Sequence, residues 1–319
     1  PPSGTFGLPG DVTIRYHHGL MAPNDLAMEA FENEYLSFSG GWGTLEDAPE
    51  NIQRIIVNSH LSVNPVYPTD MEQGFYNGEL DLITIGEEKV VDRKFSSNST
   101  FIGLNEAVVP RAFKSVTGPV YLRRGYSFAM NAIEKTGLLS ALKRQNEDYM
   151  LLVESDAECR LDSSFIYEPY NESFSAFIIA GNSALRTNMS TNDVRTLLLN
   201  HIAVAQPRGV ARKEFIRNLA GNYLIVDNET GEISGTAQST EGYRGTIPVD
   251  VIPQQISTST DNGTTWSITD WLSFSTRSLY LTVSSRFPAF HNLLLKAGLA
   301  NNKELRYPFI SESEFYTVF

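Results

Sequence analysis

Residues 126–153 read YSFAMNAIEKTGLLSALKRQNEDYMLLV, and this stretch decides the fold. Tyr126 to Lys135 is a short amphipathic run that Gly137 closes, which is typical of a helix ended by a glycine cap. Tyr149 to Val153 is apolar throughout and predicts a buried strand. The stretch therefore predicts a unit made of a helix followed by a strand.

The same unit recurs near the end of the chain. Residues 290–299 read FHNLLLKAGL, so Lys296-Ala297-Gly298-Leu299 repeats the ending Lys135-Thr136-Gly137-Leu138. An apolar run, Phe315 to Phe319, follows after a polar interval. Self-similarity of this kind indicates tandem modules.

A second repeated pattern joins a strand, an acidic turn, a helix and a histidine. Gly19 to Asp25 leads into an expected helix over 26–36, and the strand at 149–153 likewise runs into Asp156. Asn or Asp in such a position predicts a helix N-cap. Apolar helices expected over 52–60 and 194–201 each end at a histidine. Asp25 precedes His60 by 35 residues and Asp156 precedes His201 by 45, so the order repeats with a modest insertion.

Expected strands dominate the chain past His201, as in 222–226 and 242–249, each bounded by Gly, Asn or Pro. Helices followed by strands predict an α+β fold with a mostly non-parallel sheet. The apolar run at 262–270 precedes the next helix and places a module boundary near Ser284. The predicted division is 1–123 for an N-terminally incomplete module, 124–284 for a second, and 285–319 for the start of a third.

Length and charge limit the function classes. The chain has 319 residues, which suits more than one domain, and 41% of them are hydrophobic. A formal net charge of −12 argues against nucleic acid as a partner, since such binding needs a basic surface. Cys159 is the only cysteine, so an intrachain disulfide is excluded. The sequence contains no apolar stretch long enough to span a membrane.

Motifs for catalysis and metal binding are absent from the sequence. The five histidines, at positions 17, 18, 60, 201 and 291, show no spacing typical of metal ligands. A G-x-S-x-G elbow and a P-loop are also missing. Acidic residues are numerous enough that counting alone leaves a paired-carboxylate glycosidase open as a third alternative. The sequence thus favours a protein that is not an enzyme and has no cofactor or metal.

The ordered motifs resemble the fasciclin-like (fasciclin I) domain family. A strand running into a TVFAPTDEAF-type motif is matched by Leu20–Asp25, loosely by Leu152–Asp156, and in part by Tyr316–Phe319. A second family motif, a Tyr/Asn-His pair ending a helix, is matched at His60 and His201, and the late Asn-Gly segment is matched by 262–272. Three features depart from the pattern: Glu154-Ser155 replaces Pro-Thr, residues 98–103 replace the first Asn-Gly segment, and the first module lacks its opening helix.

The resemblance implies modules that are each a β-sheet wedge flanked by helices, and a role in cell-surface adhesion or protein–protein scaffolding without catalysis. The Asn- and Tyr-rich style also resembles fasciclin-domain lipoproteins of Bacteroidetes. This implies an extracellular or surface location, anchored to a bacterial outer membrane through a missing N-terminal segment, with protein partners such as a transporter complex. The alternative is a glycan-binding or accessory subunit of an outer-membrane nutrient-uptake complex. Trp42, Trp266 and Trp271 are expected either to form a sugar-stacking platform or to pack in the core, and core packing is favoured.

Five residues are candidates for partner binding: Asn24, Asp25, Asp156, His60 and His201. Each has a structural interpretation as well. The two aspartates are expected either to cap helices or to belong to a surface like the integrin-contacting loops of animal relatives, and capping is favoured. The two histidines are expected to be buried rings that brace their motifs by hydrogen bonds to backbone near Asp25 or Asp156.

Overall fold

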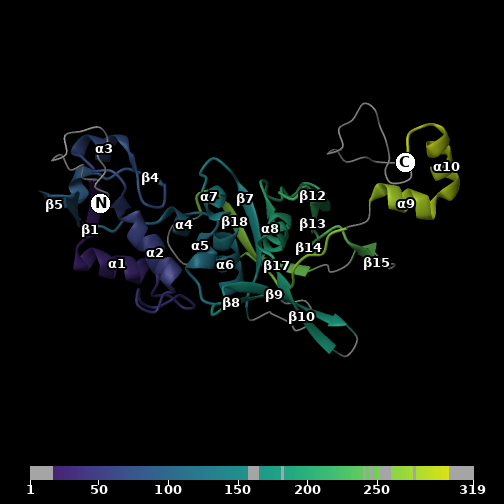
Figure 1. Ribbon diagram of the computed structural model, residues 1–319, viewed down its shortest axis with the longest axis horizontal. Helices are drawn as coiled ribbons and strands as arrows, with labels where there is room; N and C mark the ends of the chain where they lie inside the picture. The colour runs from purple at the N-terminus through teal and green to yellow at the C-terminus, as the bar shows by residue number, and fades with distance from the viewer. Residues whose placement is uncertain are drawn as a thin grey trace, which may run out of the picture.

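The computed structural model describes residues 17–156, 165–180, 183–239, 242–243, 247–251, 260–275 and 278–301. Helices and several small sheets alternate along an elongated molecule, with β1 near one end and α10 at the other (Figure 1). The predicted α+β class is confirmed. Two halves, each centred on one strand, make up most of the described chain.

The first half is built around β1 (His18–Pro23). This strand pairs with β2 (Leu61–Ser62) in an antiparallel ladder and with β6 (Ser99–Leu104) in a parallel one, and β5 (Val90–Phe95) adds the outer edge. Two helices follow β1 before the chain returns to the sheet, namely α1 (Asp25–Tyr35) and α2 (Glu50–Ser59). The expected strand, helix and His-terminated helix are confirmed.

One face of this sheet is covered by short elements inserted between β2 and β5. They are α3 (Pro68–Gln73), β3 (Phe75–Tyr76), β4 (Leu82–Ile83) and the 3-10 turn η1 (Glu87–Lys89). Their apolar side chains form a small core with Met21 and Ile102 of the sheet. The other face of the sheet receives no such cover from these elements.

Four short helices open the second half: α4 (Arg111–Lys114), α5 (Gly118–Tyr121), α6 (Ser127–Lys135) and α7 (Leu139–Leu142). The predicted glycine cap is confirmed, because Gly137 adopts a φ of 70° after α6. The amide of Leu138 donates to the carbonyl of Ile133 at 3.1 Å, and that of Gly137 donates to Glu134 at 3.0 Å. This local chemistry explains why the helix end was visible in the sequence.

The second sheet has seven strands in the order β11-β7-β18-β17-β14-β13-β12. Its central strand β7 (Tyr149–Glu154) pairs antiparallel with β11 (Ile202–Ala203) and parallel with β18 (Gly263–Ile268). The remaining ladders are antiparallel, as predicted, and involve β12 (Lys213–Arg217), β13 (Tyr223–Asp227), β14 (Glu232–Ser234) and β17 (Ile247–Val251). A separate two-stranded ladder joins β15 (Gln238–Ser239) to β16 (Gly242–Tyr243).

The interval between β7 and the His-terminated helix α8 (Thr191–Asn200) differs from the first half. There the sequence predicted a helix capped by Asp156. Residues 157–164, where that helix would begin, lie outside the described residues. From Phe165 the chain forms a three-stranded sheet of β8 (Phe165–Glu168), β9 (Ser173–Ala180) and β10 (Ser183–Met189). Phe165 and Tyr167 on β8 pack against the main core, and the described part of the first half has no such sheet between β1 and α2.

The chain then forms α9 (Leu279–Arg286) and α10 (Pro288–Lys296), which pack on each other. The strand expected at Phe315–Phe319 lies outside the described residues. The module limits at 123/124 and 284/285 stay predictions, and α9 runs across the second of them.

The largest core joins the two halves. Phe31 and Ile52 from the first half lie in one cluster with Phe113, Ile133 and Leu151 from the second. A second cluster fills the other face of the large sheet, beneath Met150 and Leu152. The two halves therefore share buried apolar surface and form one body.

Candidate interaction site and the residues that brace it

His60 links three separate segments of the first half. Its Nδ1 lies 2.8 Å from the Ile56 carbonyl, which can only accept, so Nδ1 carries the proton and donates. Its Nε2 accepts from the amide of Val108 at 2.9 Å, and its own carbonyl accepts from the amide of Met21 at 2.9 Å. One histidine thus ties α2, β1 and the segment after β6 together.

His201 repeats this arrangement in the second half. Its Nδ1 donates to the Leu197 carbonyl at 2.8 Å and its Nε2 accepts from the amide of Leu272 at 2.8 Å. Its carbonyl accepts from the amide of Leu152 at 2.9 Å. The two stretches that share a sequence pattern therefore also share a hydrogen-bond geometry.

Both rings are buried, and burial lowers the pKa of each. The pKa of His201 falls to about 4, and that of His60 also lies below its usual value. The expectation of a buried ring bonded to backbone is met, but the backbone groups are not those near Asp25 or Asp156. These contacts show that the two histidines hold backbone segments in place. Because both rings are buried, a partner could contact the segments they hold but not the rings themselves.

Asn24 and Asp25 lie exposed at the start of α1. The side chain of Asn24 is the N-cap and accepts from the amide of Ala27 at 2.9 Å. The prediction that Asp25 caps this helix is wrong by one residue: Asn24 is the cap, and Asp25 occupies the first turn, where a carboxylate is favoured by the helix dipole. Capping at this end of α1 leaves the outer side of both residues open to solvent.

Asp156 caps a helix that precedes it in the chain. Its carboxylate accepts from the amide of Ser127 at 2.8 Å and from the hydroxyl of the same residue at 2.7 Å. The helix it serves is α6, whose own N-cap residue Tyr126 makes no side-chain cap bond. Asp156 therefore caps α6, which precedes it, whereas the repeat predicted that it caps a helix after it. Asp156 and Asp25 lie on different halves and do not form one site.

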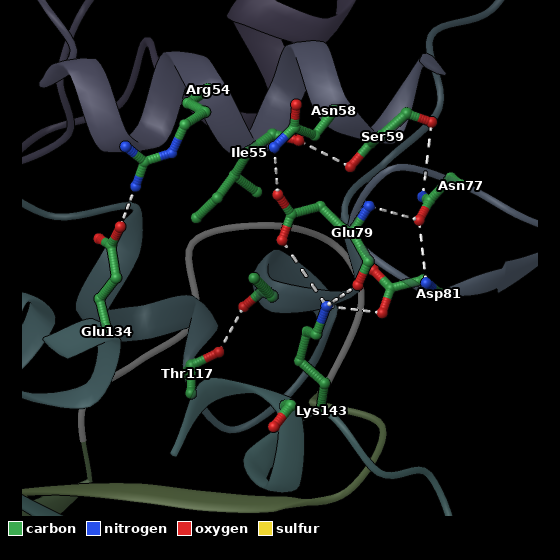
Figure 2. A network of polar contacts seen from close by, with 12 residues as sticks. Arg54, Ile55, Asn58, Ser59, Asn77, Glu79, Asp81, Thr117, Glu134 and Lys143 are labelled. Atoms are coloured by element: carbon green, nitrogen blue, oxygen red, sulfur yellow. Dashed lines mark hydrogen bonds and ion pairs between the residues drawn. The ribbon is translucent and has the colours of Figure 1, made fainter. Parts of the chain in front are cut away.

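A polar network that no sequence motif indicated lies where the halves meet (Figure 2). Lys143, the C-cap of α7, is buried and its Nζ lies 2.7 Å from a carboxylate oxygen of Asp81. The same ammonium donates to the carbonyl of Glu79 at 3.0 Å and lies 3.9 Å from its carboxylate. Asp81 and Glu79 belong to the first half and Lys143 to the second, so the cluster is a charged link across the junction.

A second ion pair crosses the same junction, between Arg54 on α2 and Glu134 on α6. The two links flank a hollow of about 240 Å³, lined by Arg54, Ile55, Glu79, Glu134, Gly137, Leu139, Ser140 and Lys143. Its charged side chains already have partners, since Asn51 also donates to Glu134 and Asn58 to Glu79. The arrangement therefore holds two halves together and leaves no carboxylate of the hollow unpaired.

Asn262 is a further residue whose role in this chain could not be read from sequence. Its side-chain oxygen accepts from the amide of Val116 at 2.7 Å, and its amide nitrogen donates to the carbonyls of Leu142 and Arg144, both at 2.7 Å. This buried side chain fastens the opening helices to the start of β18. The Asn-Gly pair was the only signal, and it predicts a turn without naming these partners.

The tryptophans do not form an exposed row. Trp271 is buried against the rings of Phe128, Phe165 and His201. Trp42 is partly buried and donates to the carbonyl of Tyr121 at 2.7 Å, while Trp266 packs on the second core. Core packing is the role that the structure gives to all three.

Among the described residues, acidic, histidine and cysteine side chains do not gather in any group of three that could hold a metal ion. Within the same ranges, every helix is too short or too polar to cross a bilayer. Cys159 lies outside the described residues.

Known proteins that resemble this chain were found among solved structures. No family model matches the chain, and no curated protein matches it. Among solved structures, the chain is similar to a FAS1 domain pair from the insect cell adhesion molecule fasciclin I, at 12% identity and a TM-score of 0.30, covering 81% of this chain and 88% of that one. A likeness this weak says nothing about partners or activity, and the α+β class rests on the chain's own sheets and helices.

Proposed function

We propose that the chain is a fasciclin-like adhesion or scaffolding protein that binds protein partners at a cell surface without catalysing a reaction. The observation that carries the proposal is the repeated brace at His60 and His201, combined with a shared core. The two histidines hold backbone segments in place, and the ion pairs of Lys143 with Asp81 and of Arg54 with Glu134 join the halves. Such a body presents fixed surfaces, which suits recognition, because rigid surfaces lose little entropy on binding.

The exposed candidates for partner contact are Asn24 and Asp25 on one half and Asp156 on the other. They lie exposed at the starts of α1 and α6, where Asn24 caps α1, Asp156 caps α6 and Asp25 occupies the first turn of α1. His60 and His201 support this function indirectly, by holding the helices and strands around them. Anchoring to an outer membrane and association with a transporter complex are finer parts of the same proposal.

The test is an adhesion assay with beads coated by the chain and applied to cells or native membrane vesicles. Binding should fall for Asp25→Ala, which keeps the Asn24 cap, and should be unchanged for Glu229→Ala, whose side chain is solvent-exposed in the second half. Equal binding by both variants would remove Asp25 from the contact surface. Turnover of a glycoside, ester or peptide substrate that a single carboxylate-to-amide change abolishes would overturn the proposal as a whole.

A further inference from the structure

A second hollow, of about 290 Å³, lies beside α4 at the junction of the two halves (Figure 1). The first half supplies β4, η1, the end of β6 and the segment that follows β6. The second half supplies α4 and the loops that precede β7 and β18, and every lining residue belongs to the described ranges. We call this hollow the α4 groove, and the side chains that matter most in it are Leu82, Thr84, Val109, Lys114 and Gln145.

The walls of the α4 groove are held in place by contacts within the chain. Val108 donates its amide proton to the ring of His60 at 2.9 Å. Arg111 forms an ion pair with Asp261 and donates to the carbonyl of Lys143 at 3.3 Å. The groove is therefore preformed, so a ligand would bind without the entropic cost of ordering its walls.

The charges of the α4 groove are not balanced. Three cationic and two acidic side chains line it, although the chain as a whole has a net charge of −12. Lys89 lies 2.7 Å from a carboxylate oxygen of Glu106, and Arg111 pairs with Asp261. Lys114 is the third cation, and it is half-buried. Among the described residues, no carboxylate lies within ion-pair distance of its ammonium.

The hollow beside Arg54 differs in this respect. Its lining contains two cations and two carboxylates, and each of them has a partner of opposite charge. Arg54 pairs with Glu134, and Lys143 lies close to Glu79 and Asp81. An unpaired cation is therefore a property of the α4 groove and not of the junction in general.

Neutral side chains add hydrogen-bond donors and apolar surface to the α4 groove. Thr84 and Gln145 are exposed, and neither side chain has a hydrogen-bond partner within the described ranges. Leu82 is 60% exposed and lines the groove together with Val109. The lining thus combines donors that suit an anionic group with apolar surface that suits a short hydrocarbon body.

We propose that the α4 groove binds a carboxylate carried on a short apolar body, with the ammonium of Lys114 as its counter-ion. The volume lies near the lower end of the range of small-ligand sites, about 300 to 1,000 Å³. Such a group is present both in a free small carboxylic acid and in the C-terminal residue of a peptide. The site goes beyond the proposed adhesive role and does not depend on it.

The test compares two probes of nearly equal shape, 3-phenylpropanoate and 3-phenylpropanamide. Each is added to the full chain at about pH 7 up to about 10 mM, and the backbone amide chemical shifts are followed by NMR. The acid should shift the amides of the groove saturably and bind at least about tenfold more tightly than the amide, because hydrogen bonds to charged groups are the stronger kind. Equal affinity for the two probes, or shifts that do not saturate, would overturn the carboxylate site.

Lys114→Met removes the charge and keeps an unbranched apolar stem. This variant should bind the acid at least about tenfold less tightly than the wild type, and it should bind the amide as the wild type does. Lys296→Met is the matched control, because it removes the charge of an exposed lysine on α10, far from α4 (Figure 1). Its affinity for the acid should be that of the wild type. An equal loss in both variants would assign the effect to overall charge and overturn the role of Lys114.

Thr84→Trp tests the position of the site independently of charge. Because Thr84 is exposed, a large side chain there should occupy the groove without disturbing the core. The variant should bind neither probe, while the amide shifts of residues distant from the groove stay those of the wild type. Wild-type affinity of this variant for the acid would mean that the acid binds elsewhere, and the proposal would fall.

An N-acetylated Gly-Gly-Phe peptide distinguishes the two sources of the carboxylate, because it ends in the same phenylpropanoate group. Higher affinity for the peptide than for the free acid would support a peptide C-terminus as the ligand, and equal or lower affinity would support a small carboxylic acid. Failure of both to bind would overturn the site. The adhesion assay would be unaffected by that failure, since it depends on the surface around Asp25.

Discussion

The Nε2 atom of His201 accepts a hydrogen bond from the amide of Leu272 at 2.8 Å, across 71 residues of chain. This bond requires a neutral ring, because a proton on Nε2 would turn the acceptor into a donor facing another donor. The first half contains the same bond between His60 and Val108. Protonation state and tertiary structure are therefore coupled at equivalent places in both halves.

The free energy of unfolding should fall as the pH drops below neutrality. The folded pKa of His201 is about 4, below its ordinary value of 6.5, so the unfolded state takes up a proton first. The stabilisation is fully present above pH 6.5 and is lost as the pH falls toward 4, by about 2 kcal/mol between pH 7 and pH 5. Urea unfolding at a series of pH values measures the slope.

The control is His201→Gln, which retains a donor and an acceptor but does not titrate. This variant should be less stable than the wild type at pH 7. The difference in the free energy of unfolding between the two proteins should be smaller by about 2 kcal/mol at pH 5. A gap that stays constant with pH would show that His201 is not the group responsible.

Replacing Lys143 by Met should destabilise the protein by about 3–5 kcal/mol, because Asp81 would keep a buried charge with no counter-ion. One oxygen of Asp81 already has no hydrogen-bond partner, so removing the ammonium would leave this buried carboxylate with still fewer donors. The matched control is Lys94→Met, which removes an exposed pair with Asp92 and should cost less than about 1 kcal/mol. Chemical denaturation measures both.

A double variant tests the electrostatic reason directly. Lys143→Met combined with Asp81→Leu removes both charges, and it should be more stable than Lys143→Met alone. If the double variant were less stable than the single one, packing by the lysine stem and not its charge would explain the loss.

The sequence predicted those features that depend on neighbouring residues. The ends of α6 and α10 follow from Gly137 and Gly298, and β7 follows from an unbroken apolar run. The contact between Lys143 and Asp81 could not be predicted, because nothing in either local sequence marks the other as a partner. The strands from Phe165 onward were not predicted, because the first half has no counterpart to them, and the helix expected directly after Asp156 falls on residues outside the described part of the chain. A buried histidine ring bonded to backbone was expected in each half, but the amides that donate to the two rings belong to Val108 and Leu272, in segments distant in sequence from each histidine.

Asn262 and Asn98 offer a comparison within one chain, because the carbonyl of each accepts from the first residue of the central strand in its half. Asn262→Ala should cost at least about 3 kcal/mol, since three buried backbone groups would lose their partner. Asn98→Ala should change the free energy of unfolding by less than about 0.5 kcal/mol, because the Asn98 side chain is exposed. Thermal unfolding of the two variants gives the difference, and similar losses would contradict the assignment of Asn262 as a link to the opening helices.

Gly263, the next residue, should tolerate no side chain. Its φ is 143°, a conformation available almost only to glycine, and a Cβ there would lie 1.9 Å from the carbonyl oxygen of Tyr149. Since that oxygen belongs to β7, Gly263→Ala can be accommodated only by parting the start of β18 from the central strand. Gly137→Ala is the matched control: its φ is also positive, but nothing lies within 4 Å of the added methyl, so only the backbone strain of about 1–2 kcal/mol remains. Hydrogen exchange should therefore show lost protection of β7 and β18 amides in Gly263→Ala alone, and equal protection in the two variants would mean that the strand contact does not depend on glycine at this position.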